Sequence, residues 1–164
     1  MADTEGAPLA ALTVYAVEGD RYDALLQQLV GIAERGGLAV RFRQHLPDDA
    51  NGISYGDGRI DLKASNPAGT VCTTLIHEYA HETMHRESER RTFSHRQLEC
   101  QAEAVAYCVC QALDVPSPNT PNYLAFYGIT RVQLAANLEA IRAGVAALMQ
   151  EIAPARIASR LAAS

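Results

Sequence analysis

The residues with the clearest capacity for chemistry form the run His77-Glu78-Tyr79-Ala80-His81. Positions i and i+4 lie on one face of a helix, so the two imidazoles can reach the same metal ion. Neutral imidazole is a good ligand for zinc, and Glu78 is placed to touch a water molecule bound to that ion. The pattern predicts a metal-activated water, with Glu78 as the general base that removes its proton.

A catalytic zinc ion needs a third protein ligand, and the next predicted helix offers two acidic candidates. Glu99 and Glu103 are four residues apart and therefore share one helix face. The small residues Ala102 and Ala106 lie beside that face and let two helices approach closely. We expect Glu99 to bind the metal and Glu103 to hold a ligand histidine in place, and the reverse assignment stays open.

His85 continues the four-residue spacing of His77 and His81. Each four-residue step adds about 40° around a straight helix, so a third histidine drifts away from a single ion. We expect His85 to support the site from behind, and a role as an alternative ligand stays open. No pattern identifies a donor for a developing oxyanion. The histidine and tyrosine candidates are His45, His95, Tyr107, Tyr123 and Tyr127.

Periodic patterns predict the elements that position these residues. Apolar residues at helical spacing predict a helix over 19–35, which Gly36-Gly37 ends. Alternation predicts a strand over 38–43, and a glycine-rich turn predicts a hairpin over 53–62.

Helices dominate the rest of the chain. They are expected over 68–87 and over 95–113, and Ser94 caps the second. A last helix is capped by Thr130 and interrupted at Pro154. The order of elements predicts an α+β fold. Its small sheet is expected to be antiparallel or mixed, with mainly antiparallel pairs, and to pack on the helix that carries the histidines.

Composition indicates an ordinary globular protein. The 164 residues are 48% hydrophobic and 20% charged, which allows a core and argues against disorder. The formal net charge of -5 gives no general attraction for nucleic acid, so direct nucleic-acid binding is not expected. No apolar run approaches the roughly 18 residues of a membrane span, and the first residues lack the basic start of a secretory signal. We expect a cytoplasmic protein without a membrane partner.

Breaker-rich segments divide the chain into three expected parts. Residues 1–12 are predicted to be a flexible N-terminal segment. Residues 13–128 are expected to form the core that carries the metal site, and residues 129–164 a C-terminal helical segment.

Two stretches of the sequence resemble a known enzyme family. They are Thr74–His85, which contains the spaced histidines, and Leu98–Tyr107, which contains both acidic candidates. Both look like the ImmA/IrrE-type zincin metallopeptidases and the related metallopeptidase domains joined to ArdC-type antirestriction proteins of mobile elements. The resemblance covers roughly residues 50–128.

This resemblance implies a zincin-like fold and a zinc-dependent metallopeptidase of the HExxH, gluzincin-like type. His77 and His81 would bind zinc, and Glu78 would be the catalytic base. Glu99 would be the third ligand, because the family's Glu-x-x-Ala pattern matches Glu99–Ala102. The strand over 58–63 would hold an extended peptide by strand addition. The substrates would be one or a few cellular proteins, such as a repressor.

Two other functions use the same residues. One is a non-catalytic, zinc-containing module that binds a peptide or protein in its groove. The other is a hydrolase that cleaves a non-peptide amide with the same water chemistry. Glu78 favours an enzyme, because a structural metal site has no need of a carboxylate there. Manganese or iron also fits such ligands, and zinc is the expected ion for this set.

Overall fold

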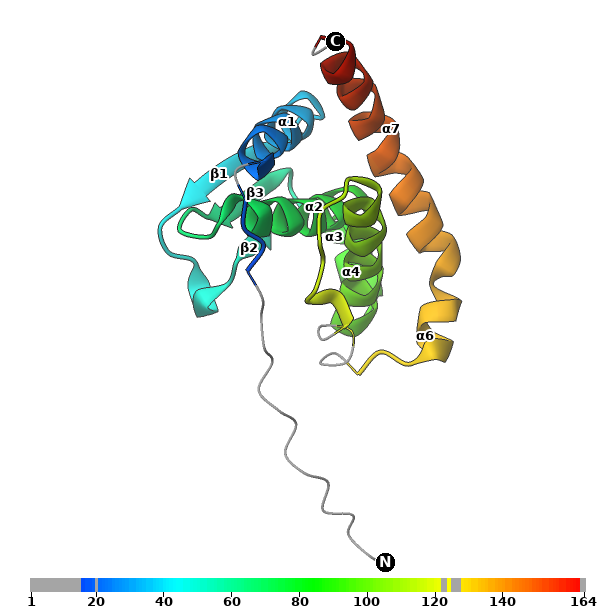
Figure 1. Ribbon diagram of the computed structural model, residues 1–164. Coiled ribbons are helices and arrows are strands. Elements are labelled where there is room, and N and C mark those ends of the chain that lie inside the picture. Colours follow the sequence, from blue (N-terminus) through cyan, green and yellow to red (C-terminus); the bar gives the residue numbers. More distant parts are fainter. Residues whose placement is uncertain (1–15, 20, 122–123, 125–127, 163–164) are drawn as a thin grey trace, which may run out of the picture.

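The structure, a computed structural model, describes residues 16–19, 21–121, 124 and 128–162, with side chains to residue 153. The predicted N-terminal segment 1–12 lies outside the described residues. Figure 1 shows the order of the elements along the chain. They are α1 (Arg21–Arg35), β1 (Ala39–Arg43), the 3-10 turn η1 (Pro47–Asp49), β2 (Gly52–Ser54), β3 (Arg59–Lys63), α2 (Ala68–Met84), α3 (Glu87–Thr92), α4 (His95–Ala112), α6 (Arg131–Ala136) and α7 (Leu138–Ala162).

Several helices begin or end where local sequence chemistry requires it. α1 ends just before Gly36-Gly37, and Gly37 has a φ of +87°, which suits a residue without a Cβ. At α4, the Ser94 side chain accepts from the Gln97 N–H and the Gln97 side chain accepts from the Ser94 N–H. The same capping box forms at Thr130, where it begins the short helix α6.

α2 ends at Met84, three residues before the predicted end at residue 87. His85 leaves the helical conformation, with φ −126° and ψ 62°. Arg90 Nε donates to the His85 carbonyl oxygen at 2.7 Å, so a side chain satisfies an acceptor at the helix end. This exit lets the separate helix α3 begin at Glu87.

The C-terminal helices break at a different place from the one predicted. α7 continues through Pro154, and the break falls at Asn137, between α6 and α7. Proline inside a helix removes one N–H and costs about 3 kcal/mol. The alanine-rich sequence on both sides has high helix propensity, which carries the backbone across that position.

Three strands in the described part of the chain form one mixed sheet, in the order β1-β3-β2. β2 and β3 pair antiparallel, as the predicted hairpin requires. β1 runs parallel to β3, from Ala39↔Arg59 to Arg43↔Lys63, so the sheet is mixed rather than mainly antiparallel. β3 is paired on both sides, which leaves β2 at one edge of the sheet.

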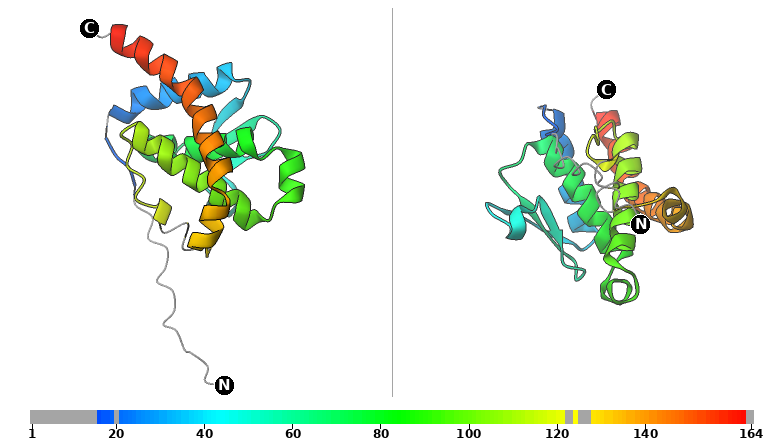
Figure 2. Two further views of the ribbon diagram at one scale, coloured as in Figure 1. Left: turned by 90° about the vertical axis from the view of Figure 1, so that its right-hand side faces the viewer. Right: turned by 90° about the horizontal axis from the view of Figure 1, so that it is seen from below.

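α2 lies at the centre of the molecule, with the sheet on one side and α4 and α7 on the other (Figure 2). The fold is therefore α+β, as the sequence predicts. No helix among the described residues has both the length and the apolar character needed to cross a bilayer. The largest fully buried apolar side chains come from the sheet, α2 and α7: Ile60, Leu62, Leu75, Ile76, Leu148 and Ile152.

Candidate metal centre

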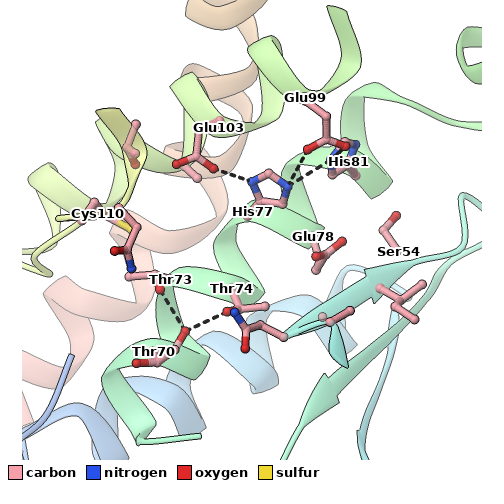
Figure 3. A pocket seen from close by; sticks show the side chains of 18 of the residues that line it. Ser54, Thr70, Thr73, Thr74, His77, Glu78, His81, Glu99, Glu103 and Cys110 are labelled. Carbon is pink, nitrogen blue, oxygen red and sulfur yellow. Dashed lines mark hydrogen bonds and ion pairs between the residues drawn. The ribbon is translucent and has the colours of Figure 1, made fainter. Parts of the chain in front are cut away.

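Two helices meet at the site and turn four of the predicted residues toward one another (Figure 3). His77 and His81 lie one turn apart on α2, and Glu99 and Glu103 lie one turn apart on α4. The helices pack closely because small residues lie between them, and Ala102 is completely buried. The structure therefore brings together the side chains that the sequence selects, and their roles as ligands stay predictions.

Three of these side chains converge on one point. His77 Nε2 lies 3.1 Å from His81 Nε2. The two carboxylate oxygens of Glu99 lie 3.5 Å and 3.4 Å from those nitrogens, respectively. Ligand atoms about 2.0–2.1 Å from a tetrahedral zinc ion lie roughly 3.3–3.4 Å apart, which is close to the observed spacing. Two imidazoles and one carboxylate also suit a catalytic site with an open fourth position, so the residues fit a zinc ion.

Glu103 lies on the other side of the His77 ring. Its Oε2 is 3.0 Å from His77 Nδ1, the ring nitrogen that does not face His81. A carboxylate in this position fixes the orientation of the ring and leaves Nε2 available to a metal. Glu99 is thus close to both Nε2 atoms and Glu103 only to the back of one ring. This arrangement favours Glu99 as the ligand over the reverse assignment.

The carboxylates control the protonation of His77 in the metal-free chain. Burial disfavours the charged ring, but hydrogen bonds with Glu103 and Glu99 outweigh it and raise the pKa of His77 well above its usual value. Burial acts against ionisation of Glu99 as well, yet the two histidines outweigh it and lower the pKa of that carboxyl. Binding of a metal ion to His77 Nε2 would therefore compete with a proton on that ring.

His81 is held from behind by another imidazole. His85 Nδ1 lies 2.9 Å from His81 Nδ1, and His85 Nε2 lies 2.8 Å from Gln101 Oε1. Burial lowers the pKa of His81 to about 4 and also lowers the pKa of His85, so both rings are neutral near pH 7. Because both nitrogens of His85 are engaged away from the convergent Nε2 atoms, His85 supports the site through His81 and is not placed as a ligand.

Glu78 points from α2 toward the edge strand β2 (Figure 3). A Cβ on Gly52 would lie 3.0 Å from Glu78 Oε1, so a glycine allows the strand to approach this closely. Burial raises the pKa of Glu78, while the neighbouring His77 and a backbone hydrogen bond from Ser54 oppose the rise. A buried carboxyl with a raised pKa is suited to accept a proton and to return it.

A cavity of about 690 Å³ opens between β2, α2 and α4. The three convergent residues and Glu78 line it, together with residues 49–54 and 117–120. Its volume lies within the range of sites that bind small molecules. The edge strand at this cavity is β2, which corrects the assignment of the substrate strand to residues 58–63. β3 cannot receive a further strand because β1 and β2 already occupy both of its edges.

Of the three oxyanion candidates that the structure describes, one lies at the cavity. His95 is part of its lining. Tyr107, which is 41% exposed, and His45, which is also exposed, are not among the lining residues. Tyr123 and Tyr127 lie outside the described residues. Within the described part of the chain, His95 is therefore the candidate that can reach a substrate in the cavity.

Sequence reasoning missed Glu82, which ties the hairpin to α2. Its side chain is only 2% exposed and accepts hydrogen bonds from Ser54 Oγ at 2.6 Å and from the N–H groups of Gly56 and Gly58 at 2.6 Å and 2.8 Å. The sequence contains one indication of this role, because Glu82 falls four residues after Glu78 and therefore lies on the same face of α2. Its partners come from a distant turn, and no local pattern specifies how that turn packs.

Comparisons with protein-family models, with curated proteins and with solved structures find no match to this chain. Function is therefore inferred from the residues and from their geometry.

Proposed function

We propose that this protein is a zinc-dependent metallopeptidase that hydrolyses peptide bonds. The observation that carries the proposal is the convergence of His77 Nε2, His81 Nε2 and the Glu99 carboxylate, 3.1–3.5 Å from one another, beside the buried carboxyl of Glu78. The resemblance to the ImmA/IrrE-type zincins supports the same activity. It extends the proposal to a zincin-like fold and to a cytoplasmic regulatory protease with narrow protein substrates.

Each site residue has a separate role in this proposal. When bound, zinc supplies a Lewis acid that polarises a carbonyl group and lowers the pKa of a water molecule. Glu78 takes a proton from the attacking water and later delivers it to the leaving amine nitrogen, so the carboxylate is regenerated. Glu103 and His85 hold the rings of His77 and His81 in their orientations throughout.

An extended peptide would add to the open edge of β2. The Lys63 N–H donates to the Asn51 carbonyl and the Tyr55 N–H donates to the Arg59 carbonyl. Ile53 lies opposite Asp61 in the same register, so residues 51, 53 and 55 pair with β3. The backbone groups of residues 52 and 54 therefore point away from β3, on the side where Glu78 and the cavity lie. Because the Ser54 N–H bonds to Glu78, a peptide would pair with the backbone of Gly52 and with the Ser54 carbonyl, and this pairing would hold a scissile carbonyl near Glu78.

The metal content of the purified protein tests the ligand set. We expect about one zinc per chain in the wild type, because three donor atoms already converge. His81→Ala and Glu99→Ala each remove one donor and should lose the metal, whereas Glu87→Gln on the exposed surface of α3 should keep it. Elemental mass spectrometry measures all four proteins. Wild-type protein that takes up no zinc, even after incubation with the ion, overturns the proposal.

Cleavage of a defined peptide library, with products identified by mass spectrometry, tests the chemistry. We expect Glu78→Gln to keep its zinc and to cleave at least about 100-fold more slowly, the usual contribution of a general base. Equal cleavage by the wild type and the variant would rule out the assigned mechanism. Zinc uptake without any peptide cleavage would favour the binding module or the hydrolase of non-peptide amides, and a screen of small amides separates these two.

A further inference from the structure

We infer that Gln101 and Asn137 are positioning residues of the metal centre. Through His85 they hold His81 in the tautomer that carries its proton on Nδ1 and leaves the Nε2 lone pair free. The inference rests on the proposed function, and it assigns to the site two amide side chains that lie outside the predicted ligand set.

A chain of four hydrogen bonds leads from His81 to the junction of α6 and α7. His81 Nδ1 lies 2.9 Å from His85 Nδ1, and His85 Nε2 lies 2.8 Å from Gln101 Oε1. Gln101 Nε2 donates to Asn137 Oδ1 at 2.6 Å, and Asn137 Nδ2 donates to the backbone carbonyl of Gln133 at 2.7 Å. The chain thus crosses from α2 over α4 into the C-terminal segment.

The last acceptor sets the direction of the whole chain. A carbonyl oxygen can only accept, so the amide NH₂ of Asn137 must face Gln133, and Asn137 Oδ1 faces Gln101. That oxygen requires the NH₂ group of Gln101, whose own oxygen is then directed at His85. His85 Nε2 must therefore carry a proton. In a neutral ring this leaves His85 Nδ1 as the acceptor for the Nδ1–H of His81.

The opposite arrangement would block the metal centre. In it, His85 Nδ1–H donates to His81, and His81 Nε2–H turns its proton toward His77 Nε2 and Glu99 Oε1, which are 3.1 Å and 3.4 Å away. The nitrogen proposed to bind zinc would then be protonated. Gln101 opposes this state, because an unprotonated His85 Nε2 would face the Gln101 oxygen at 2.8 Å with no proton between two acceptors.

Burial makes this preference effective. His85 is 1% exposed and Gln101 is 5% exposed, so neither side chain can exchange its partner for bulk water. The orientation of the Gln101 amide therefore favours the tautomer of His81 that carries its proton on Nδ1.

Nuclear magnetic resonance of metal-free protein with ¹⁵N-labelled histidine tests the inference directly. Long-range ¹H–¹⁵N correlations report which ring nitrogen is protonated. We expect Nδ1–H for His81 and Nε2–H for His85 in the wild type. Gln101→Leu removes the acceptor and should move His81 toward Nε2–H, and zinc affinity should fall about 10–100-fold. Gln111→Leu, on the exposed end of the same helix α4, is the matched control and should change neither.

Asn137→Ala is the milder variant, at a partly exposed position, and it serves where Gln101→Leu does not fold. It frees the Gln101 amide to rotate, so we expect a mixture of His81 tautomers and a smaller loss of affinity. A His81 proton on Nε2 in the wild type, or an unchanged tautomer in the folded variants, overturns the inference. The tautomers are measured in metal-free protein, so this result does not depend on zinc binding. If the wild type shows the expected tautomers but takes up no zinc, the proposed function is overturned and the inference about Gln101 and Asn137 stands.

Discussion

At the scale of single residues, the two carboxylates of α4 act on different atoms of the same ring. Glu99 lies beside His77 Nε2 and Glu103 beside His77 Nδ1. Glu99 also reaches His81 Nε2, whereas Glu103 is not paired with a second histidine in the described structure. Replacing the two acids should therefore have unequal consequences, although they occupy successive turns of one helix.

Glu103→Gln should weaken zinc binding without abolishing it. The amide oxygen of glutamine can still accept from His77 Nδ1–H, but the charge that makes the ring a stronger ligand is lost. We expect an affinity about 10-fold lower, measured by competition with a chelator. In the metal-free protein the pKa of His77 should fall toward its usual value, because one of the carboxylates that raise it is gone.

Two further variants test whether the loss of zinc affinity in Glu103→Gln reflects the position of Glu103 behind the His77 ring. Glu99→Gln removes a proposed direct ligand and should cost more affinity than Glu103→Gln, while Glu87→Gln on exposed α3 should cost none. The reverse order, with binding lost in Glu103→Gln and kept in Glu99→Gln, would make Glu103 the third ligand.

The site residues that sequence alone predicts are those within one helical turn of each other. The spacing of His77 and His81, and that of Glu99 and Glu103, depends only on helix periodicity, and the structure brings the two pairs together. The contact of His85 with Gln101 joins the residue that follows α2 to α4, across 16 positions of the sequence. It depends on how α2 and α4 pack, which no local pattern specifies.

At the scale of elements, strand order is what the sequence could not supply. The alternating pattern predicts the strands and the glycines predict the turn, and both form. Hydrophobic alternation does not say which neighbour a strand takes, and β1 inserts beside β3 in parallel, which makes β3 central. The edge available to a peptide is consequently β2, a strand of only three residues that needs external support.

Glu82 supplies that support, so Glu82→Ala should loosen β2 and its turn. Three hydrogen bonds to a buried carboxylate are lost, and two of their donors are backbone N–H groups of Gly56 and Gly58. We expect the free energy of unfolding, measured in urea titrations, to fall by at least about 3 kcal/mol, because each of the two backbone N–H groups alone loses a bond to a charged group that contributes about 1.5–3 kcal/mol. Amide hydrogen exchange at Gly56 and Gly58 should accelerate most.

Controls separate this contact from a general effect of losing an acid. Glu82→Gln keeps one acceptor oxygen and should lose less stability than Glu82→Ala. Glu139→Ala removes an exposed acid of α7 that pairs with Arg142 at the surface, and should change stability by less than about 1 kcal/mol. Unchanged exchange at the two glycines in Glu82→Ala would show that the hairpin holds itself in place.

At the scale of the whole molecule, the C-terminal helices are continuous with the core. The sequence suggests a boundary after residue 128, because breakers and a cap lie there. In the structure, Ile141, Leu148 and Ile152 belong to the same buried cluster as the residues of α2 and α4. The packing is tight, since a Cβ on Gly144 would lie 2.4 Å from Met84 Sδ at the end of α2. Helical periodicity marks an apolar face but not the partner that covers it.

A chain ending at residue 128 should therefore fail to fold cooperatively. The truncated chain loses Ile141, Leu148 and Ile152. Burial of such a side chain contributes about 1.5–3 kcal/mol, so the three together contribute roughly 5–9 kcal/mol. This sum is comparable with the whole stability of a typical domain. Leu148→Ala tests the same packing in the full chain and should cost about 2–5 kcal/mol in urea titrations. Val132→Ala, at a position 78% exposed on α6, should cost less than about 0.5 kcal/mol. If the truncated chain unfolds cooperatively and still binds zinc, this prediction is wrong, and residues 129–164 are not required for folding of the core.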